Sequence, residues 1–148
     1  MNRKTYRRLL RLFSAVPGLY PLLAFLAARR VIVRGRSMQP ALRPGDRVLF
    51  DRLAYELRAP KAGEVVLCAH PARPRLRMVK RILAAPGEPF VADGRREILG
   101  RGEYALIGDT PELSTDSRQL GPVRRRDILA RAWLVYWPPE RFRVMDRG

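Results

Sequence analysis

The chain contains few of the residues from which metal sites, disulfides and histidine-based active sites are built. Among 148 residues it has one cysteine, Cys68, and one histidine, His70. A lone cysteine cannot form an intramolecular disulfide, and it excludes a thiol-based metal cluster. We therefore expect no metal and no cofactor. A Ser-His-Asp triad would have to use His70, but this residue precedes Pro71 and is expected to end a strand instead.

Lysine and serine are also scarce, which makes their positions informative. Arginine supplies 27 of the 30 basic side chains, yet position 80 is a lysine. Arginine would provide the same charge there, but only lysine can lose its proton. Lys80 is therefore a candidate general base. The four serines are Ser14, Ser37, Ser114 and Ser117.

Acidic side chains are outnumbered by basic ones. The chain has 14 Asp and Glu residues against 30 Lys and Arg residues, a net charge of +16. Such an excess favours an anionic partner, either nucleic acid or a membrane surface. The basic residues are spread from Arg3 to Arg147, and no nucleic-acid-binding motif accompanies them. We expect membrane association and no nucleic acid.

No uninterrupted apolar run reaches the roughly 20 residues that a membrane-spanning helix needs. Residues 13–28 are nearly uncharged, but Pro17, Gly18 and Pro21 interrupt them. Basic residues flank this run on both sides, so its orientation is not determined. The alternatives are a membrane anchor, a peripheral helix with arginines at lipid phosphates, and a core helix of a soluble cytoplasmic domain. We expect residues 1–30 to form a basic segment with an apolar helix that associates with the membrane.

Residues 31–148 are expected to fold as one mostly β domain, since this length can bury a real core. Short runs rich in Val, Ile, Leu, Phe and Tyr alternate with turn signals such as Pro44-Gly45-Asp46. These runs cover residues 31–34, 47–52, 64–69, 76–84, 89–92, 103–107 and 128–137. Their close spacing, without long helices between them, predicts a small antiparallel β-fold.

The strand expected over residues 76–83 would give Lys80 the surroundings of a base. Side chains two positions apart share a face of a strand, so Lys80 would lie beside Met78 and Ile82, with Arg81 on the other face. Apolar neighbours disfavour the ammonium form and lower the pKa of a lysine. A neutral lysine can activate a serine hydroxyl, which predicts a Ser/Lys hydrolase.

Three groups of residues, in order along the chain, carry a resemblance to a known family. They are Ser37-Met38-Gln39-Pro40, Lys80-Arg81 with Pro86-Gly87-Glu88, and Gly108-Asp109-Thr110 leading into Ser114-Thr115-Asp116-Ser117-Arg118. Over about residues 31 to 137 the chain resembles the type I signal peptidase, or leader peptidase, family of Ser/Lys proteases. The resemblance implies the β-fold that these enzymes share with self-cleaving repressors.

The resemblance also implies a catalytic role for three side chains. Ser37 matches the nucleophile, and its backbone N–H matches the first donor of an oxyanion hole. Lys80 matches the general base, and Ser114 matches a hydroxyl that orients the lysine amine. Gly35 stands where some members have a hydroxyl side chain, so backbone or water would complete the oxyanion hole.

Two acid–base pairs are implied as support for these side chains. Asp116 and Arg118 match one pair. Asp109 is similar to the carboxylate that pairs with the arginine after the catalytic lysine, which is Arg81 in this chain. Without the serine and lysine motifs, Asp116 and Arg118 would indicate only an ordinary surface turn.

The small size of the domain indicates a branch within the family. The span between Gly87 and Gly108 is too short for the second β-region of larger leader peptidases. The chain is similar to the small branch that includes nickel-type superoxide dismutase maturation proteases and mitochondrial inner-membrane peptidases. The implied activity is removal of an N-terminal leader or pro-peptide from a precursor polypeptide, with a superoxide dismutase precursor as the first candidate.

Two other functions are alternatives. A self-cleaving repressor would share the Ser/Lys chemistry, but it needs a DNA-binding helix-turn-helix, for which thirty proline-broken residues are too few. The other alternative is a non-catalytic basic β-domain bound to membranes or nucleic acid. In that case Ser37 and Lys80 would be dispensable.

Overall fold

The computed structural model describes residues 3–145, so residues 1–2 and 146–148 of the two expected segments lie outside it. The strands are β1 Arg29–Ile32, β2 Arg47–Asp51, β3 Val65–His70, β4 Arg73–Ala84, β5 Pro89–Ala92, β6 Arg95–Ile98, β7 Glu103–Ile107, β8 Val123–Arg124, β9 Ile128–Trp137 and β10 Arg143–Val144. The helices are α1 Arg3–Ser14, α2 Leu19–Ala27, α3 Ala54–Leu57 and α4 Ser117–Leu120, with 3-10 turns η1 Pro111–Leu113, η2 Arg125–Asp127 and η3 Pro139–Arg141.

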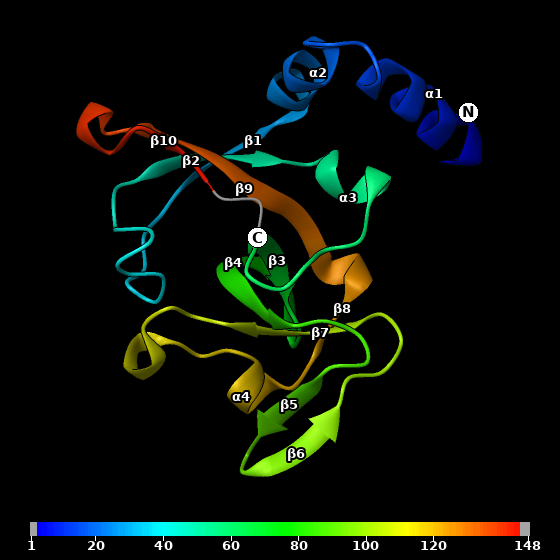
Figure 1. Cartoon of the computed structure of the whole chain (residues 1–148). Helices are drawn as coiled ribbons and strands as arrows, with labels where there is room; N and C mark the ends of the chain where they lie inside the picture. The colour runs from blue at the N-terminus through cyan, green and yellow to red at the C-terminus, as the bar shows by residue number, and fades with distance from the viewer. Residues whose placement is uncertain (1–2, 146–148) are drawn as a thin grey trace.

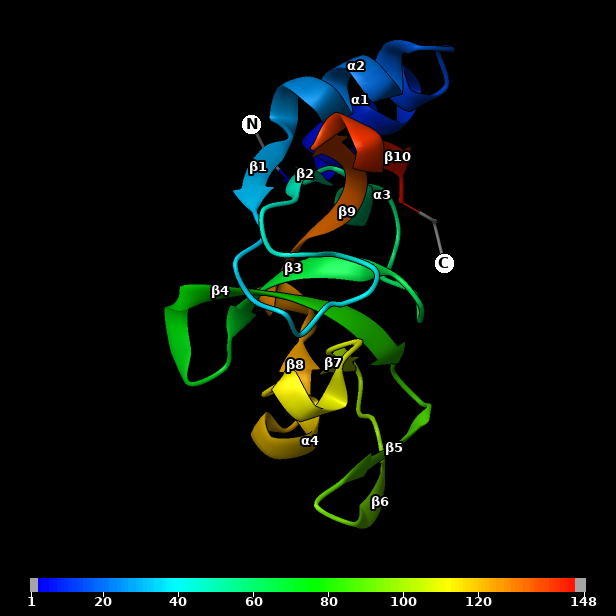
Figure 2. The same ribbon diagram turned by 90° about the vertical axis from the view of Figure 1, so that its left-hand side faces the viewer.

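The mostly antiparallel β-fold expected from the sequence is confirmed. The main sheet runs in the order β1-β2-β9-β3-β4-β7-β8, with β10 paired to β9, and its neighbouring strands are antiparallel. The strands β5 and β6 form a separate hairpin that projects from the end of the molecule opposite α1 and α2 (Figures 1 and 2). Strand β6 was not expected, because its residues are all exposed and lack an apolar face.

Helical structure precedes the β domain, as expected, but the apolar run over residues 13–28 does not form one continuous helix. The chain forms two short helices, with α1 ending at Ser14 and α2 beginning at Leu19. The break falls at Pro17 and Gly18, and Gly18 has a φ of 80°, which a helix cannot continue through. Of the helices in the described part of the chain, none is both long and apolar enough to cross a membrane.

Helix α2 is docked on the β domain by a partly buried polar contact. Tyr20 donates a hydrogen bond of 2.6 Å from its hydroxyl to Asp51 at the end of β2. Ala24, on the same helix, is fully buried. The first strand begins at Arg29 rather than Val31, so the N-terminal segment runs directly into the sheet.

Three apolar clusters pack around the sheets, and the smallest, which includes Phe90 and Leu99, lies at the β5–β6 hairpin. The first gathers Phe50, Leu67 and Val135 from three strands together with Met38 and Leu42 from the loop after β1. The second lies around β3, β4 and β7, with Val66, Cys68, Ile82, Leu106 and Ile128 among its members. The loop that carries Ser37 is therefore tied to the core and is not a free surface segment.

Candidate active site

Ser37 lies in a turn between β1 and β2, and the residues after it anchor this turn. Met38 is 2% exposed and Leu42 is fully buried, so both side chains insert into the first apolar cluster. The Leu42 N–H donates to the carbonyl of Met38 at 2.7 Å. Apolar burial on the C-terminal side holds the turn and leaves the half-buried Ser37 at the surface of a groove.

The loop after β7 holds the backbone of this turn. The Thr110 N–H donates to the Ser37 carbonyl at 2.9 Å, and the Thr110 hydroxyl donates to the Gln39 carbonyl at 2.9 Å. Gly108 packs in the same contact, since a Cβ at this position would lie 2.6 Å from the Ser37 carbonyl oxygen and 2.4 Å from Ser114 Oγ. Only glycine allows Ser37 and Ser114 to approach so closely.

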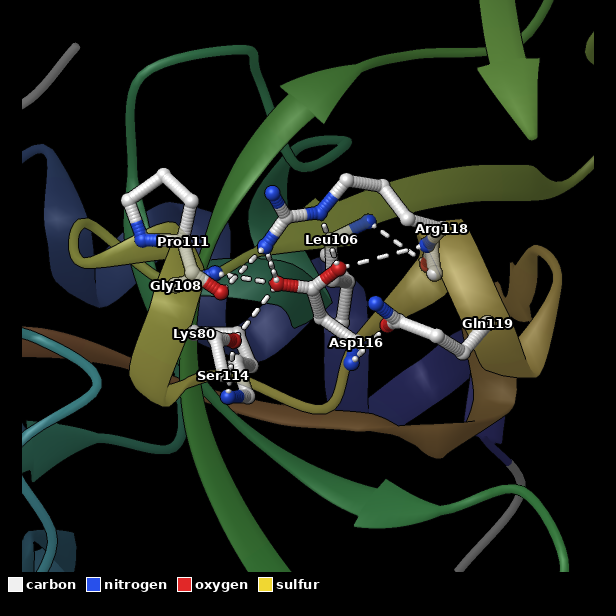
Figure 3. A network of polar contacts seen from close by, with 9 residues as sticks. Lys80, Leu106, Gly108, Pro111, Ser114, Asp116, Arg118 and Gln119 are labelled. Carbon is white, nitrogen blue, oxygen red and sulfur yellow. Dashed lines mark hydrogen bonds and ion pairs between the residues drawn. The ribbon is translucent and has the colours of Figure 1, made fainter. Parts of the chain in front are cut away.

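Lys80 lies on β4, opposite Val66 of β3, and is 5% exposed. Its Nζ donates a hydrogen bond of 2.7 Å to Ser114 Oγ (Figure 3). Burial lowers the pKa of Lys80 below its ordinary value, and the negative charge of Asp116 opposes this in part. The amine is therefore easier to deprotonate than that of a solvent-exposed lysine.

Asp116 accepts hydrogen bonds from three sides. Ser114 Oγ donates to it at 2.5 Å, the Gly108 N–H at 2.9 Å, and Arg118 forms a two-pronged ion pair at 2.9 and 2.8 Å. Burial by itself would raise the pKa of Asp116, but these donors outweigh it and hold the pKa well below the usual range. Asp116 is therefore ionised at neutral pH.

The charge on Asp116 sets the direction of the hydrogen bonds around Ser114. A hydroxyl has one proton, and Ser114 uses this proton in the hydrogen bond that it donates to the Asp116 carboxylate. Ser114 must therefore accept from Lys80, which fixes one N–H of the amine. A neutral Lys80 thus keeps its lone pair free for another proton donor. Figure 3 shows this chain of contacts from Lys80 to Arg118.

The start of α4 holds Asp116 in place. The Asp116 N–H donates to the Gln119 side chain at 3.0 Å, while the Asp116 carboxylate accepts from the Arg118 N–H at 3.2 Å. The Asp116 side chain also accepts from the Gln119 backbone N–H, and its two contacts with Gln119 form a capping box at the helix N-terminus. The capping role of Gln119 was missed from the sequence, although an acidic residue followed by Gln three positions later signals it.

The other expected pair, Arg81 and Asp109, lies on the opposite face of β4. The guanidinium makes two hydrogen bonds of 2.7 Å to the carboxylate, and a third of 2.7 Å to the Gly63 carbonyl. The pair joins β4 to the loop that also supplies Gly108 and Thr110. It fixes this loop on the strand that carries Lys80.

Ser37 and Lys80 line one groove of about 800 Å³, whose walls are mostly apolar. Residues 31–35 form one wall. The other wall is the part of β4 before Arg81, the residue at which β4 begins to pair with β7. The Lys80 amine donates to Ser114 in this state and not to Ser37. The arrangement can position a peptide so that its carbonyl meets Ser37 and its proton transfers involve Lys80.

His70 lies elsewhere in the groove and is occupied by its own turn. β3 ends at His70, as expected, and its Nδ1 accepts from the N–H groups of Ala72 and Arg73 at 3.1 and 3.2 Å. This ring therefore shapes the β3–β4 turn. Within residues 3–145, no group of three His, Cys, Asp or Glu side chains is placed to hold a metal ion.

The structure brings together the residues singled out in the sequence. Ser37 and Lys80 line the same groove. A chain of hydrogen bonds links Lys80 to Ser114, Ser114 to Asp116, and Asp116 to Arg118. Gly108 and Thr110 were missed as positioning residues, although they belong to the Gly-Asp-Thr motif. Their effect depends on contacts with a turn about 70 residues earlier, which no local pattern reveals.

Comparison with known proteins gives consistent matches. The family described as "Signal peptidase, peptidase S26" matches residues 6–95 and 88–137. The chain is 37% identical over 119 residues to mitochondrial ATP-independent inner membrane protease subunit 1a of Arabidopsis thaliana, covering 74% of this chain and 71% of that protein. It is 32% identical over 118 residues to mitochondrial inner membrane protease subunit 1 of Xenopus tropicalis, covering 76% of this chain and 71% of that protein. It is also 32% identical over 122 residues to subunit 2 of this protease from Mus musculus, covering 77% and 70%.

Proposed function

This chain belongs to the signal peptidase family, peptidase S26, and from this premise we propose that it is a Ser/Lys endopeptidase that removes N-terminal leader or pro-peptides. Ser37 is the nucleophile and Lys80 is the general base. The substrate is a precursor polypeptide, and the protein acts in association with a membrane, as the names of its relatives suggest.

One observation carries this proposal: a buried lysine amine, oriented by Ser114, lines the same groove as Ser37. An exposed lysine has a pKa of about 10.4, so less than about 1% of such side chains are neutral near pH 8. Burial lowers the pKa of Lys80 and increases the neutral fraction. The bond to Ser114 leaves the lone pair available for the proton of Ser37.

In the acylation step, neutral Lys80 takes the proton of the Ser37 hydroxyl while Oγ attacks the scissile carbonyl carbon. The carbonyl π electrons move to oxygen and form a tetrahedral oxyanion. When this intermediate collapses, the C–N bond breaks, and the ammonium of Lys80 gives its proton to the leaving amine. The products are an ester on Ser37 and the released C-terminal part of the precursor.

The oxyanion would be stabilised by the Ser37 backbone N–H, which makes no hydrogen bond within the described residues. Gly35, two residues earlier, provides no hydroxyl. A second donor must come from another backbone N–H or from water. The Thr110 contact to the Ser37 carbonyl holds this peptide unit in position.

In the deacylation step, water attacks the ester carbonyl and gives a proton to Lys80. Collapse of the second tetrahedral intermediate breaks the bond to Ser37 Oγ, which recovers its proton from Lys80. Each group then returns to its starting state. The ionised Asp116 stays charged throughout and positions Ser114.

The groove supports an extended peptide as substrate. Val31, Val33, Leu76 and Met78 are among the apolar residues along its walls. An extended segment between two strands can bond to backbone groups while its alternate side chains enter pockets. Small residues such as Ala before the scissile bond fit this proposal.

The first prediction concerns the nucleophile. Ser37→Ala should reduce cleavage of a precursor peptide at least about a thousandfold, because no other hydroxyl replaces Oγ as nucleophile. Cleavage is measured by mass spectrometry of the products, and circular dichroism checks that the variant folds. Ser14→Ala is the matched control and should retain full activity. A Ser37→Ala variant with a tenth or more of the activity would overturn the assignment.

The finer substrate assignment is also a proposal. The short β5–β6 hairpin is all that stands between the Lys80 strand and β7, which favours action on few precursors. We retain a superoxide dismutase precursor as the first candidate from the resemblance in sequence.

A further inference from the structure

A second cavity, separate from the substrate groove, is lined mainly by arginine. It has a volume of about 650 Å³ and lies between α1, α3 and the start of β9. Half of its twelve lining residues are arginines, whereas arginine makes up 27 of the 148 residues of the chain. They are Arg7, Arg11, Arg52, Arg58, Arg125 and Arg126. We call this cavity the arginine pocket.

Arg7 and Arg58 of the pocket have carboxylate partners that anchor them. Arg7 pairs with Glu56 at 3.1 Å, which joins α1 to α3. Arg58 pairs with the buried Glu64. The charges of these two arginines are largely balanced within the protein, so they build the wall of the pocket more than they attract a ligand.

Arg125 is held in a different way. Its guanidinium donates to the Tyr55 carbonyl at 2.6 Å and to the Ile128 carbonyl at 3.1 Å, and it lies 5.2 Å from the centre of the Tyr55 ring. These contacts fix its orientation without neutralising its charge. A half-buried guanidinium in this state gains from an anion that reaches its remaining N–H groups.

Arg52 and Arg126 place further positive charge at the mouth of the pocket. Arg52 is exposed, and the Arg126 side chain is 75% exposed, with Asp127 no closer than 4.0 Å. Guanidinium groups bind phosphate oxygens with two parallel hydrogen bonds. Three arginines around one cavity therefore suit a phosphate-containing ligand.

Exposed apolar side chains occur on α1, which lines the pocket, and on α2. On α1, Leu12 is 68% exposed, and on α2, Phe25 and Leu26 are 50% and 71% exposed. Both helices lie at the same end of the molecule (Figures 1 and 2), and α1 also supplies Arg7 and Arg11 to the pocket. Basic and apolar residues on one helix are typical of helices that lie in a membrane interface. A nucleic acid would use the charge but not the leucines.

We propose that the arginine pocket binds the phosphate headgroup of an anionic phospholipid, while exposed leucine and phenylalanine side chains of α1 and α2 enter the bilayer interface. The pocket gives the protein a preference for anionic membranes over neutral ones. This inference goes beyond the peptidase function and does not depend on it.

The test uses the full chain and two double variants of equal charge. The pocket variant carries Arg52→Gln and Arg126→Gln. The control variant carries Arg95→Gln and Arg96→Gln on β6, which are exposed and lie at the opposite end of the molecule (Figures 1 and 2). Binding is measured by co-sedimentation with phosphatidylcholine vesicles and with mixed vesicles of phosphatidylcholine and phosphatidylglycerol.

The unaltered chain should prefer the mixed vesicles. The pocket variant should lose about tenfold or more of its affinity for them and little for phosphatidylcholine, and the control should lose less than about twofold. Equal losses in the two variants would mean that only total charge matters, and would overturn the proposal. So would equal binding of the unaltered chain to both kinds of vesicle.

Two further measurements distinguish a lipid ligand from nucleic acid, and lipid binding from peptidase activity. A short DNA duplex whose binding falls only in the pocket variant, with vesicle binding unchanged, would assign the pocket to nucleic acid and overturn the proposal. Cleavage of a soluble precursor peptide should be the same in both variants. If the unaltered chain cleaved no peptide but still preferred mixed vesicles, the proposed peptidase function would be contradicted and the lipid-binding proposal would stand.

Discussion

At the scale of single residues, the proposed chemistry depends on the protonation of Lys80 and Asp116, which both contact the Ser114 hydroxyl. Asp116 is held ionised by Arg118, Ser114 and the Gly108 N–H. Lys80 is made easier to deprotonate by burial. Because Ser114 donates to Asp116, it accepts from Lys80 in either protonation state of the amine.

This arrangement predicts how activity depends on pH. Only the unprotonated amine accepts the Ser37 proton, so the rate should rise with pH through an apparent pKa below the usual value of about 10.4. Lys80→Arg should be as inactive as Lys80→Met, since a guanidinium stays protonated. The measurement is the pH profile of kcat/KM for a precursor peptide.

Lys61 provides the matched control for these variants. It is exposed and lies outside the groove, so Lys61→Arg and Lys61→Met should both retain activity. His70→Ala should also remain active. An active Lys80→Arg variant would show that position 80 supplies only positive charge.

At the scale of elements, the loop after β7 is what joins the Ser37 turn to the Lys80 strand. Thr110 bonds to the turn, Asp109 bonds to Arg81 of β4, and Gly108 packs between Ser37 and Ser114. The loop therefore sets the distance between Ser37 and Ser114, which are the proposed nucleophile and the residue proposed to orient the base.

Gly108→Ala should test this close approach without removing any functional group. The added Cβ would lie 2.4 Å from Ser114 Oγ and 2.6 Å from the Ser37 carbonyl oxygen, so the two serines must separate. We expect activity to fall about a hundredfold and the free energy of unfolding to fall by about 1–3 kcal/mol. Peptide cleavage and urea denaturation measure these effects.

Gly35→Ala is the control for folding, because its Cβ would meet nothing within 4 Å. Its free energy of unfolding should change by less than about 0.5 kcal/mol. A Gly108→Ala variant with full activity would show that the loop does not determine the catalytic geometry.

A second link between elements holds the far end of the Ser37 loop. Asp46, 1% exposed, accepts two hydrogen bonds of 2.8 Å from Arg141 of η3 and one of 2.9 Å from the Arg43 N–H. Burial alone would raise the pKa of Asp46, but these donors lower it below its ordinary value. The ionised form is therefore the one that stabilises the fold.

Asp46→Asn should lower the free energy of unfolding at pH 7 by about 2–3 kcal/mol, because it leaves the Arg141 charge without its partner. In the unaltered chain the Asp46 carboxylate binds a proton more readily in the unfolded state than in the folded state, because folding lowers its pKa. The contribution should therefore be complete above the unfolded pKa of about 3.9 and decline as the pH falls through the lower folded value. Urea denaturation between pH 2 and pH 7 measures both effects.

Asp127→Asn is the matched control, since Asp127 lies 4.0 Å from a mostly exposed Arg126. It should change stability by less than about 0.5 kcal/mol. If Asp46→Asn behaved in the same way, the Asp46 link would contribute nothing to the fold.

At the scale of the whole molecule, the N-terminal helices and the groove lined by Ser37 and Lys80 belong to one folded unit. Tyr20 of α2 bonds to the buried Asp51, and β1 continues from α2 into the groove wall. If the N-terminal helices attach the peptidase to a membrane, it would meet precursors whose leaders emerge from the same membrane.

The range of precursors can be tested in cells. We expect a strain carrying only the Ser37→Ala allele to accumulate one or a few unprocessed proteins, with a superoxide dismutase precursor the first to examine. N-terminal mapping by mass spectrometry, compared with the unaltered strain, measures this. Accumulation of many signal-bearing precursors would indicate a general leader peptidase instead.

Several features were determined by the sequence alone, because they depend on residues close together in the chain. The strands β5, β7 and β9 begin and end where the apolar runs and turn signals predicted. The alternation along β4 predicted that Lys80 shares its surroundings with Met78 and Ile82. The rarity of lysine and serine, together with three motifs in order, identified the residues of the candidate site.

Other features were decided only by the tertiary structure, because they depend on which strands become neighbours. Neither the contact of Gly108 with Ser37 nor the convergence of Arg52, Arg125 and Arg126 on one cavity has a local signature. The break between α1 and α2 was signalled by Pro17 and Gly18, but the docking of α2 depends on the buried Asp51. Short-range patterns specify strands and turns, whereas the order of strands in the sheet brings distant side chains into contact.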